Sequence, residues 1–469
     1  MPKTKNRPKP AVIAQLCKGC GRCIEACPKH CFQPGTEINP QSGLIPIELD
    51  LTDCNGCGLC FDTCPEAYAL AHLFEGAPGE AEIDYDALFG DLNSTALPPV
   101  LIPDTQIPLP KTKPLILKGT YAAAIGAVIA GCRHFFGYPI TPSTEGAELL
   151  AKLLPEFDGV FVQAVSEVAT VNMMYGCGGA GLPAMTFTSS PGFSLMLEGV
   201  SYMIGAEVPG VFVNVMRGGP GLGNIGPEQS DIKLACRGLG HGNTHAIVLA
   251  PSSPQEMLDL TVLAFQLTFK YRNPVVVLGD GYLGQITGKV DLPRTMNKPG
   301  IPEWAVYGDE RHRGNLICSI ALSEIELEKH NEYLNRKYEQ ISENEQRADL
   351  FCCDDAEIII VAANTPSRMA RGAVQMLRAH GVRAGLFRPV TLWPFPIDDF
   401  LPLLDAAEEI VVVEASNGQL EDELRLALAK SHTVDVPLIE SVRHFGGILP
   451  QQEEIFEAVM HSVARLTYV

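Results

Sequence analysis

The chain has 469 residues, and at about 150 residues per domain this length suggests about three domains. Hydrophobic residues make up 46% and charged residues 19%, a globular balance that excludes a mainly disordered or fibrous chain. The formal net charge of −20 argues against general nucleic-acid binding, because such binding needs a basic surface. A small basic docking patch is still compatible with this composition.

The apolar runs are too short for a membrane-spanning helix. The run 122–130 is among the longest, whereas a span needs about 18 or more apolar residues. The basic start, MPKTKNRPKP, has no apolar segment behind it, so we do not expect a secretory signal. We expect a solvated N-terminal tail, no membrane contact and a location in the cytoplasm.

The cysteines are concentrated near the N-terminus, where nine of the 15 lie in the first 64 residues. Two runs there follow the pattern C-x2-C-x2-C-x3-C-P. In this pattern three closely spaced thiolates hold one iron–sulfur cube, and its fourth ligand comes from the other run. The sequence therefore predicts two [4Fe–4S] clusters, one held by Cys17, Cys20, Cys23 and Cys64, the other by Cys54, Cys57, Cys60 and Cys27.

Two other uses of these cysteines fit less well. Disulfides need an oxidising compartment, and zinc sites favour longer spacers between C-x2-C pairs. Cys31 is left over, and we expect it to be a small buried residue rather than a ninth ligand. Residues 8–75 resemble the bacterial two-cluster ferredoxins, which implies a small α+β domain at residues 1–75.

Residues 76–113 are rich in proline and carry no sustained helical or strand pattern, which predicts an extended linker. From about residue 114, short apolar strands alternate with helices, the pattern of a parallel sheet with helices on both faces. We assign residues 114–295 to this first α/β domain. Its expected strands are 159–165, 184–189, 211–217, 245–250 and 274–278, and its expected helices are 121–130, 166–175, 193–206 and 254–271.

Residues 296–353 break this alternation, and their acidic, polar helix near 324–343 suggests a connector. The alternation resumes in residues 354–469, which we expect to form a second α/β domain. Ligands of such sheets bind at the carboxyl ends of the strands. The expected strands are 357–363, 382–387, 410–414 and 436–440, and the expected helices are 366–380, 397–407, 418–430 and one after Pro450.

Three side chains at expected strand ends of the first domain are the candidate site residues. Thr141 either caps a helix that begins at Pro142 or holds its hydroxyl towards a cleft. Glu167 opens the next helix, where the helix dipole favours an acid and where a carboxylate could also hold a protonated ring nitrogen of a cofactor. Arg217 ends a strand before a glycine-rich loop, and there its planar fork suits a carboxylate or a phosphate.

Two glycine motifs are weak indications of a cofactor site. Residues 221–226 match the dinucleotide pattern G-x-G-x-x-G, but Pro227 follows at once and the next strand ends without the acidic residue that binds ribose. The run Gly279-Asp280-Gly281 resembles the start of a thiamine diphosphate motif. No magnesium-binding asparagine follows at the required distance, since Asn297 comes too early, so we expect only a turn at a strand end.

Beyond residue 113 the chain resembles the α subunits of 2-oxoacid:ferredoxin oxidoreductases. The matching runs are 130–142, 188–195 and 213–221 in the first domain, and 387–396 and 413–419 in the second. The run 221–231 is most similar to that of the 2-oxoisovalerate type. The resemblance implies a doubly wound thiamine-pyrimidine-type domain and a transketolase C-terminal-like domain. The ferredoxin module, usually a separate δ subunit, stands fused in front.

The resemblance also implies cofactors, partners and roles. Thiamine diphosphate lies between the α subunit and a separate β subunit, which supplies the diphosphate and magnesium site. Glu167 matches the glutamate that bonds the aminopyrimidine nitrogen, while Thr141 and Arg217 match the residues that hold the oxo group and the carboxylate of the substrate. Carbon dioxide leaves, and coenzyme A, bound with help from a γ subunit, takes the acyl group. The clusters pass electrons to a soluble ferredoxin, which suggests an anaerobic cytoplasm.

Other interpretations stay open at this point. The chain could be a non-catalytic electron-transfer subunit with a degenerate oxidoreductase scaffold, although the joint presence of Thr141, Glu167 and Arg217 argues against it. The missing diphosphate motif opposes a self-contained thiamine enzyme. Branched 2-oxoacids and 2-oxoglutarate are both plausible substrates. Candidate readers of a distal carboxylate, each more often a structural or surface residue, are Arg133, His134, Arg237 and His241.

Overall fold

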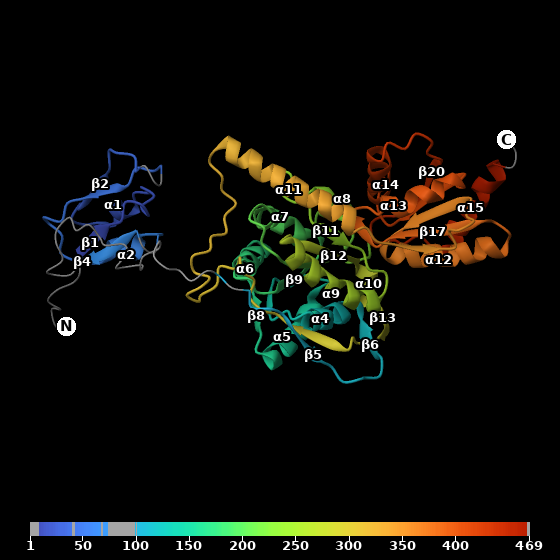
Figure 1. Ribbon diagram of the computed structural model, residues 1–469, viewed down its shortest axis with the longest axis horizontal. Helices are drawn as coiled ribbons and strands as arrows, with labels where there is room; N and C mark the ends of the chain where they lie inside the picture. Colours follow the sequence, from blue (N-terminus) through green and yellow to red (C-terminus); the bar gives the residue numbers. More distant parts are fainter. Residues whose placement is uncertain (1–8, 40–42, 67–68, 74–98, 100, 467–469) are drawn as a thin grey trace. The chain divides into compact units, whose positions relative to one another are not determined.

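The computed structural model describes residues 9–39, 43–66, 69–73, 99 and 101–466 (Figure 1). The chain divides into two compact units, residues 1–95 and 96–469, which we call the N-terminal unit and the α/β unit. Most of the linker expected at residues 76–113 lies outside the described residues.

The N-terminal unit is built from two halves that each run strand, helix, strand. β1 pairs antiparallel with β4, and β2 pairs antiparallel with β3. Each helix carries the third cysteine of its run, Cys23 or Cys60, so the two halves place their cysteines alike. The elements are β1 (Lys9–Val12), α1 (Arg22–Ala26), β2 (Phe32–Pro34), β3 (Ile47–Leu49), α2 (Leu59–Thr63) and β4 (Leu70–Leu73).

The larger sheet of the α/β unit contains, within the described residues, seven strands in the order β18-β11-β12-β10-β9-β7-β8. Neighbouring strands are parallel except β18, which runs antiparallel to β11. The carboxyl ends of the parallel strands therefore meet at one edge, where ligands are expected. The strands are β7 (His134–Gly137), β8 (Val160–Gln163), β9 (Ala184–Thr188), β10 (Val211–Met216), β11 (Ile247–Leu249), β12 (Val275–Asp280) and β18 (Thr391–Trp393).

Helices cover both faces of this sheet. α4 packs along α9, and α6 packs along α7 (Figure 1). The expected doubly wound fold is thereby confirmed, and we call this part the first lobe. Its helices are α4 (Gly119–Ile129), α5 (Thr144–Leu153), α6 (Glu167–Gly179), α7 (Ser190–Gly205), α8 (Ile232–Arg237), α9 (Pro254–Tyr271) and α10 (Gly281–Gln285).

The second lobe is built on a smaller sheet with the order β15-β17-β16-β19-β20, parallel except for β15 at the edge. This sheet agrees with the expected α/β fold, while both lobes lie within one compact unit. Its strands are β15 (Ala348–Phe351), β16 (Ile358–Ala362), β17 (Ala384–Pro389), β19 (Glu409–Glu414) and β20 (Leu438–Arg443). Its helices are α12 (Asn364–Ala379), α13 (Ile397–Phe400), α14 (Gln419–Lys430) and α15 (Gln452–Leu466).

Short strands at the expected boundaries differ from the sequence prediction. β5 (Thr105–Pro108), within the expected linker, pairs with β14 (Thr295–Lys298), and β6 (Leu115–Lys118) pairs with β13 (Thr287–Val290). β15 lies within the residues expected for the connector, which otherwise contains the expected long helix, α11 (Glu324–Asn344). Each of these strands pairs with a segment far away in sequence, so local pattern alone carries little signal for it.

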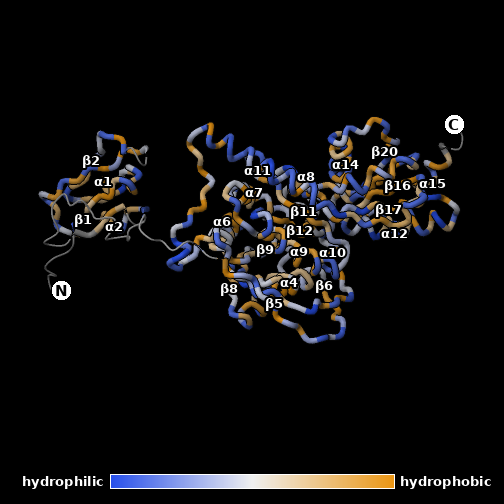
Figure 2. Tube along the Cα trace, in the orientation of Figure 1, coloured by the Kyte–Doolittle hydropathy of each residue, from blue (hydrophilic) through white to orange (hydrophobic). Residues whose placement is uncertain are grey.

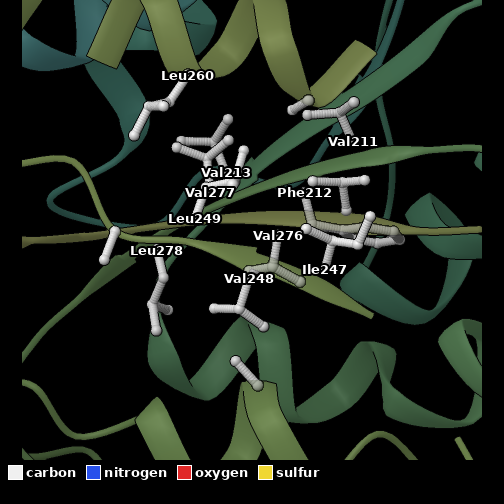
Figure 3. Packing of buried hydrophobic residues seen from close by; sticks show 14 of the residues in the cluster. Val211, Phe212, Val213, Ile247, Val248, Leu249, Leu260, Val276, Val277 and Leu278 are labelled. Atoms are coloured by element: carbon white, nitrogen blue, oxygen red, sulfur yellow. The ribbon is translucent and has the colours of Figure 1, made fainter. Parts of the chain in front are cut away.

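The core lies between the central strands and their helices. Figure 3 shows Val213 and Val277 on the side of Leu260 from α9, whereas Val248 and Val276 point to the opposite face. These side chains are buried, as expected for parallel strands covered on both faces. Figure 2 shows the same strands as hydrophobic, while α11 is largely hydrophilic. None of the helices in the described ranges combines the length and the apolar character needed to cross a bilayer.

Candidate active site and cluster cavities

The N-terminal unit contains two cavities of similar size lined by cysteines. One is lined by Cys27, Cys54, Cys57 and Cys60, with Cys31 beside them. The other is lined by Cys17, Cys20, Cys23 and Cys64. The fold thus brings together the two ligand sets expected from the sequence, each with three cysteines from one run and one from the other.

The chemistry of these thiols fits an iron–sulfur centre. Burial raises the pKa of Cys23 to about 11 and raises the pKa of Cys60, so neither thiol ionises readily without a metal. Burial also opposes ionisation of Cys27, but backbone N–H groups of residues 29–31 bond its sulfur and hold its pKa below the usual value. The described residues contain no set of His, Cys, Asp or Glu placed to hold a single metal ion. Each cavity brings four cysteine side chains together, the ligand set that a [4Fe–4S] cube requires.

Glu167 is the first residue of α6 and lies at the carboxyl end of β8. Ser166 caps this helix, since its hydroxyl accepts a hydrogen bond of 3.2 Å from the N–H of Ala169. The Glu167 side chain is 5% exposed, and its carboxylate makes no hydrogen bond within the described residues. The helix cap therefore holds in place a buried carboxylate that has no hydrogen-bond partner among the described residues.

Gly192, in the first turn of α7, faces the Glu167 carboxylate. A Cβ at this position would lie 2.7 Å from Glu167 Oε1 and 2.4 Å from Thr188 Oγ1, so only glycine fits. The hydroxyls of Thr188 and Ser189 are buried and find no hydrogen-bond partner in the described part of the chain. No role was predicted for these residues, although the run Thr-Ser-Ser-Pro-Gly between a strand and a helix marks them as part of the strand end.

Thr141 lies at the carboxyl end of β7, and of the two roles considered for it the helix cap is wrong. The turn over residues 140–143 is closed because the N–H and the hydroxyl of Ser143 bond the Ile140 carbonyl at 3.0 and 2.7 Å. This turn delays the start of α5 to Thr144, so Pro142 is not the first helical residue. The Thr141 side chain is exposed, which leaves its hydroxyl accessible.

Arg217 follows β10 and is 7% exposed. Its Nη1 donates to the Thr141 carbonyl at 2.8 Å and its Nη2 to the Leu222 carbonyl at 3.2 Å. Its Nε–H is buried and finds no acceptor among the described residues. The guanidinium is thus anchored at Nη1 and Nη2 beside Thr141, while its buried Nε–H is left without a protein acceptor in the described part of the chain.

The glycine-rich loop after Arg217 folds back on itself rather than opening a helix. Asn224 bonds its own loop through the N–H of Gly226 at 2.8 Å and the second lobe through the carbonyl of Gly446 at 2.9 Å. Gly223 has a φ of +56°, and a Cβ there would stand 1.7 Å from the Gly218 carbonyl oxygen. The second lobe therefore helps to fix the loop beside the site.

Asp280 ends β12 at the same edge, and its carboxylate is fully used inside the protein. It accepts hydrogen bonds from the N–H groups of Tyr282 and Leu283 at 3.0 and 2.9 Å. It also accepts from the N–H and the hydroxyl of Thr365 at 2.9 and 2.8 Å. Asp280 thus caps α10 in the first lobe and α12 in the second. The structure agrees with the expected turn at this strand end, and the buried carboxylate has no room for a metal.

The four candidate readers of a distal carboxylate lie elsewhere. Arg133 and His134 are at the amino end of β7, where Arg133 bonds the carbonyls of residues 128 and 132 and His134 contacts the Pro183 carbonyl. Arg237 pairs with Glu423 at 2.7 Å. The ring of His241 packs edge-on against Tyr202. None of the four approaches the guanidinium of Arg217 in the contacts of the described residues.

Three models of protein families match the chain. Residues 125–350 match the model described as pyruvate flavodoxin/ferredoxin oxidoreductase, thiamine diphosphate-binding. Residues 356–455 match the pyruvate:ferredoxin oxidoreductase core domain II, and residues 16–68 match the 4Fe-4S dicluster domain.

Similar proteins come from archaea and bacteria. Ketoisovalerate oxidoreductase subunit VorB of Methanothermobacter thermautotrophicus is 47% identical over 346 residues, which cover 73% of this chain and 96% of the relative. The 2-oxoglutarate synthase subunit KorA of Methanocaldococcus jannaschii is 36% identical over 367 residues, 73% of this chain and 98% of the relative. Among solved structures, the 2-oxoglutarate:ferredoxin oxidoreductase of Magnetococcus marinus, with 2-oxoglutarate, coenzyme A and succinyl-CoA bound, matches with a TM-score of 0.67 and 27% identity. That match covers 75% of this chain and 65% of the other.

Proposed function

Because the chain belongs to the family of 2-oxoacid:ferredoxin oxidoreductases, we propose that it is the α subunit of such an enzyme, with a ferredoxin domain fused in front. The enzyme would oxidise a 2-oxoacid with coenzyme A to an acyl-CoA and carbon dioxide. Electrons would pass through two [4Fe–4S] clusters to a soluble ferredoxin. The observation that supports this most is the meeting of Arg217 with Thr141 at the edge of the sheet where Glu167 also lies.

The residues of this edge fit the expected cofactor and substrate. Thiamine diphosphate supplies, when bound, the carbon nucleophile that attacks the 2-oxo carbon and an electron sink for the decarboxylation. Glu167 would accept a hydrogen bond from the protonated pyrimidine nitrogen, and its burial strengthens that bond. The free Nε–H of Arg217 would bind the substrate carboxylate, and the Thr141 hydroxyl would donate to the oxo oxygen.

A separate β subunit would complete the site. Asp280 is occupied by helix caps, so the diphosphate and Mg²⁺ need ligands from another chain. Large apolar side chains stand exposed around the same edge, as expected for a surface that a partner covers. They are Tyr138, Val165, Val168, Leu195, Leu222, Ile225 and Tyr282. A γ subunit would help to bind coenzyme A, and the anaerobic cytoplasm stays a prediction.

We favour a branched 2-oxoacid over 2-oxoglutarate as the substrate. Leu222, whose carbonyl accepts from Arg217, is 83% exposed, and Ile225 of the same loop is 63% exposed. These apolar side chains beside the carboxylate donor suit a branched hydrocarbon tail. The four candidate cations for a second carboxylate lie away from Arg217, and the relative at 47% identity is named a ketoisovalerate oxidoreductase.

The first experiment is purification of the native complex under argon, with identification of its partners. Viologen reduction is then measured with 2-oxoisovalerate and 2-oxoglutarate, each with and without coenzyme A. We expect turnover that needs coenzyme A, a co-purifying thiamine-binding subunit and a higher kcat/KM for 2-oxoisovalerate. A complex with clusters but without a thiamine subunit or turnover would favour the alternative, a non-catalytic electron-transfer subunit. The comparisons do not favour that alternative, since the relatives are oxidoreductase subunits.

A further inference from the structure

Asp231 precedes α8 and lies at the usual cap position, yet its side chain does not cap the helix. The residue is buried, and its Oδ2 accepts two hydrogen bonds from other elements. Ser190 of α7 donates to it at 2.6 Å and Asn214 of β10 at 2.9 Å. Burying a carboxylate costs free energy unless it is hydrogen-bonded in this way. Because Asp231 bonds α7 and β10, its role lies outside the helix that it precedes.

Ser190 links Asp231 to Arg217. The backbone N–H of Arg217 donates to the Ser190 hydroxyl at 3.1 Å. A hydroxyl has one proton, and the short bond to Asp231 fixes where that proton points, which leaves a lone pair for the Arg217 N–H. Ser230 donates to the carbonyl of Arg217 at 2.9 Å. Two hydroxyls therefore hold both backbone polar groups of Arg217.

The side chain of Arg217 is held at its other end, because its tips bond the carbonyls of Thr141 and Leu222. With the backbone and the tips both fixed, the Nε–H has one direction. We propose that Asp231 is a positioning residue which, through the hydroxyl of Ser190, sets the direction in which Arg217 presents its Nε–H to the substrate carboxylate. This inference rests on the proposed role of Arg217.

The positioning role needs a hydrogen-bond acceptor at residue 231. A carboxylate only accepts hydrogen bonds, so it forces the Ser190 proton away from Arg217. Asp231→Ala removes the acceptor that fixes that proton, so the Ser190 hydroxyl can turn to Ser230 Oγ, 3.2 Å away, and no longer holds the Arg217 N–H in one place. Asp231→Asn keeps an oxygen that can accept from Ser190 and Asn214 and should preserve the arrangement.

The test uses the assembled complex and separates KM from kcat. We expect Asp231→Ala and Ser190→Ala to raise the KM for the 2-oxoacid about five- to tenfold, the effect of losing one buried hydrogen bond, with a smaller change in kcat. The KM for coenzyme A should stay unchanged, and Asp231→Asn should restore the 2-oxoacid KM to within about twofold of wild type. Ser194→Ala is the matched control, since its hydroxyl lies one turn further along α7 and bonds only the Ser190 carbonyl in the described contacts.

Arg217→Lys distinguishes a failure of the positioning role from a failure of the proposed carboxylate site. If it raises the 2-oxoacid KM while Asp231→Ala and Ser190→Ala do not, the positioning role is wrong and the proposed function stands. If Arg217→Lys also leaves that KM unchanged, the proposed carboxylate site itself fails. An Asp231→Asn enzyme as impaired as Asp231→Ala would contradict the hydrogen-bond route. Should Asp231→Ala not assemble, Ser190→Ala alone decides.

Discussion

The N-terminal unit and the α/β unit differ in whether the binding residues are part of the buried core. Of the nine described residues in the buried core of the N-terminal unit, five are cysteines, and the largest of the others is Phe32. In the α/β unit one hydrophobic cluster runs through both lobes, and the candidate site lies at its edge. In the first unit the residues that bind are also the core, so the cofactor supports the fold. In the second the core is complete without a ligand, and the fold supports the site.

Removing the iron should give the largest effect and tests this contrast directly. A unit with so small an apolar core depends on its metal, so residues 9–73 should lose their amide protection when a chelator strips the clusters. Residues 115–466 should keep theirs. Hydrogen exchange with mass spectrometry, together with iron analysis, measures both units in one sample. Full protection of residues 9–73 in iron-free protein would contradict the dependence.

Glu167→Gln should lower turnover without changing the iron content. The amide cannot hold the pyrimidine nitrogen protonated as a carboxylate does, so viologen reduction by the complex should fall at least about 100-fold. The clusters lie in the other unit, so the iron content should stay at the wild-type value. Glu198→Gln is the matched control, since the carboxylate of Glu198 on α7 bonds only Tyr202 in the described contacts. An active Glu167→Gln enzyme would refute the assignment.

Asp280→Ala should destabilise the α/β unit without changing the Mg²⁺ requirement of turnover. It leaves the first N–H groups of α10 and α12 without their acceptor, at a cost of about 2–4 kcal/mol in the free energy of unfolding. The melting temperature of the α/β unit should fall, while the concentration of Mg²⁺ that half-saturates turnover stays the same. A shift in that Mg²⁺ requirement would mean that Asp280 is a metal ligand after all.

Cys31→Ala should give the smallest effect. It tests the difference between a cysteine that fills space and a cysteine that binds iron in the N-terminal unit. Cys31 lines one cavity, and burial raises its pKa to about 12, so it stays a neutral thiol that fills space. Its removal should leave about eight irons in the protein. Cys60→Ala, at a predicted ligand, should lose iron from one cluster. Iron loss in Cys31→Ala would make Cys31 a ligand.

The two units also differ in what their sequences reveal. The cluster cysteines follow from spacing alone, because three of each set lie within one short run and the fourth is placed by the repeat. Glu167 at a helix start and Arg217 at a strand end could be located from alternation of strands and helices. The contact between Arg217 and Thr141 could not, because it depends on the order of strands across the sheet.

The errors have a common physical cause. Thr141 failed as a cap because a side-chain hydrogen bond of Ser143 closes a turn that composition does not show. The turn at Asp280 was predicted correctly, but its second partner, Thr365, lies 85 residues away in sequence and could not be foreseen. β5, β15 and β18 are short, and each is stabilised by a distant partner. Local propensity does not predict contacts of this kind.

β18 has a consequence for the way the protein is made. It comes from the second half of the α/β unit, yet it covers the edge of β11 in the first lobe, where Trp393 stacks on His245. A ribosome releases the strands of the first lobe long before residues 391–393 emerge. During that interval the edge of β11 offers unpaired backbone groups to any other strand. A chain shortened before residue 391 would keep that edge open permanently and should aggregate.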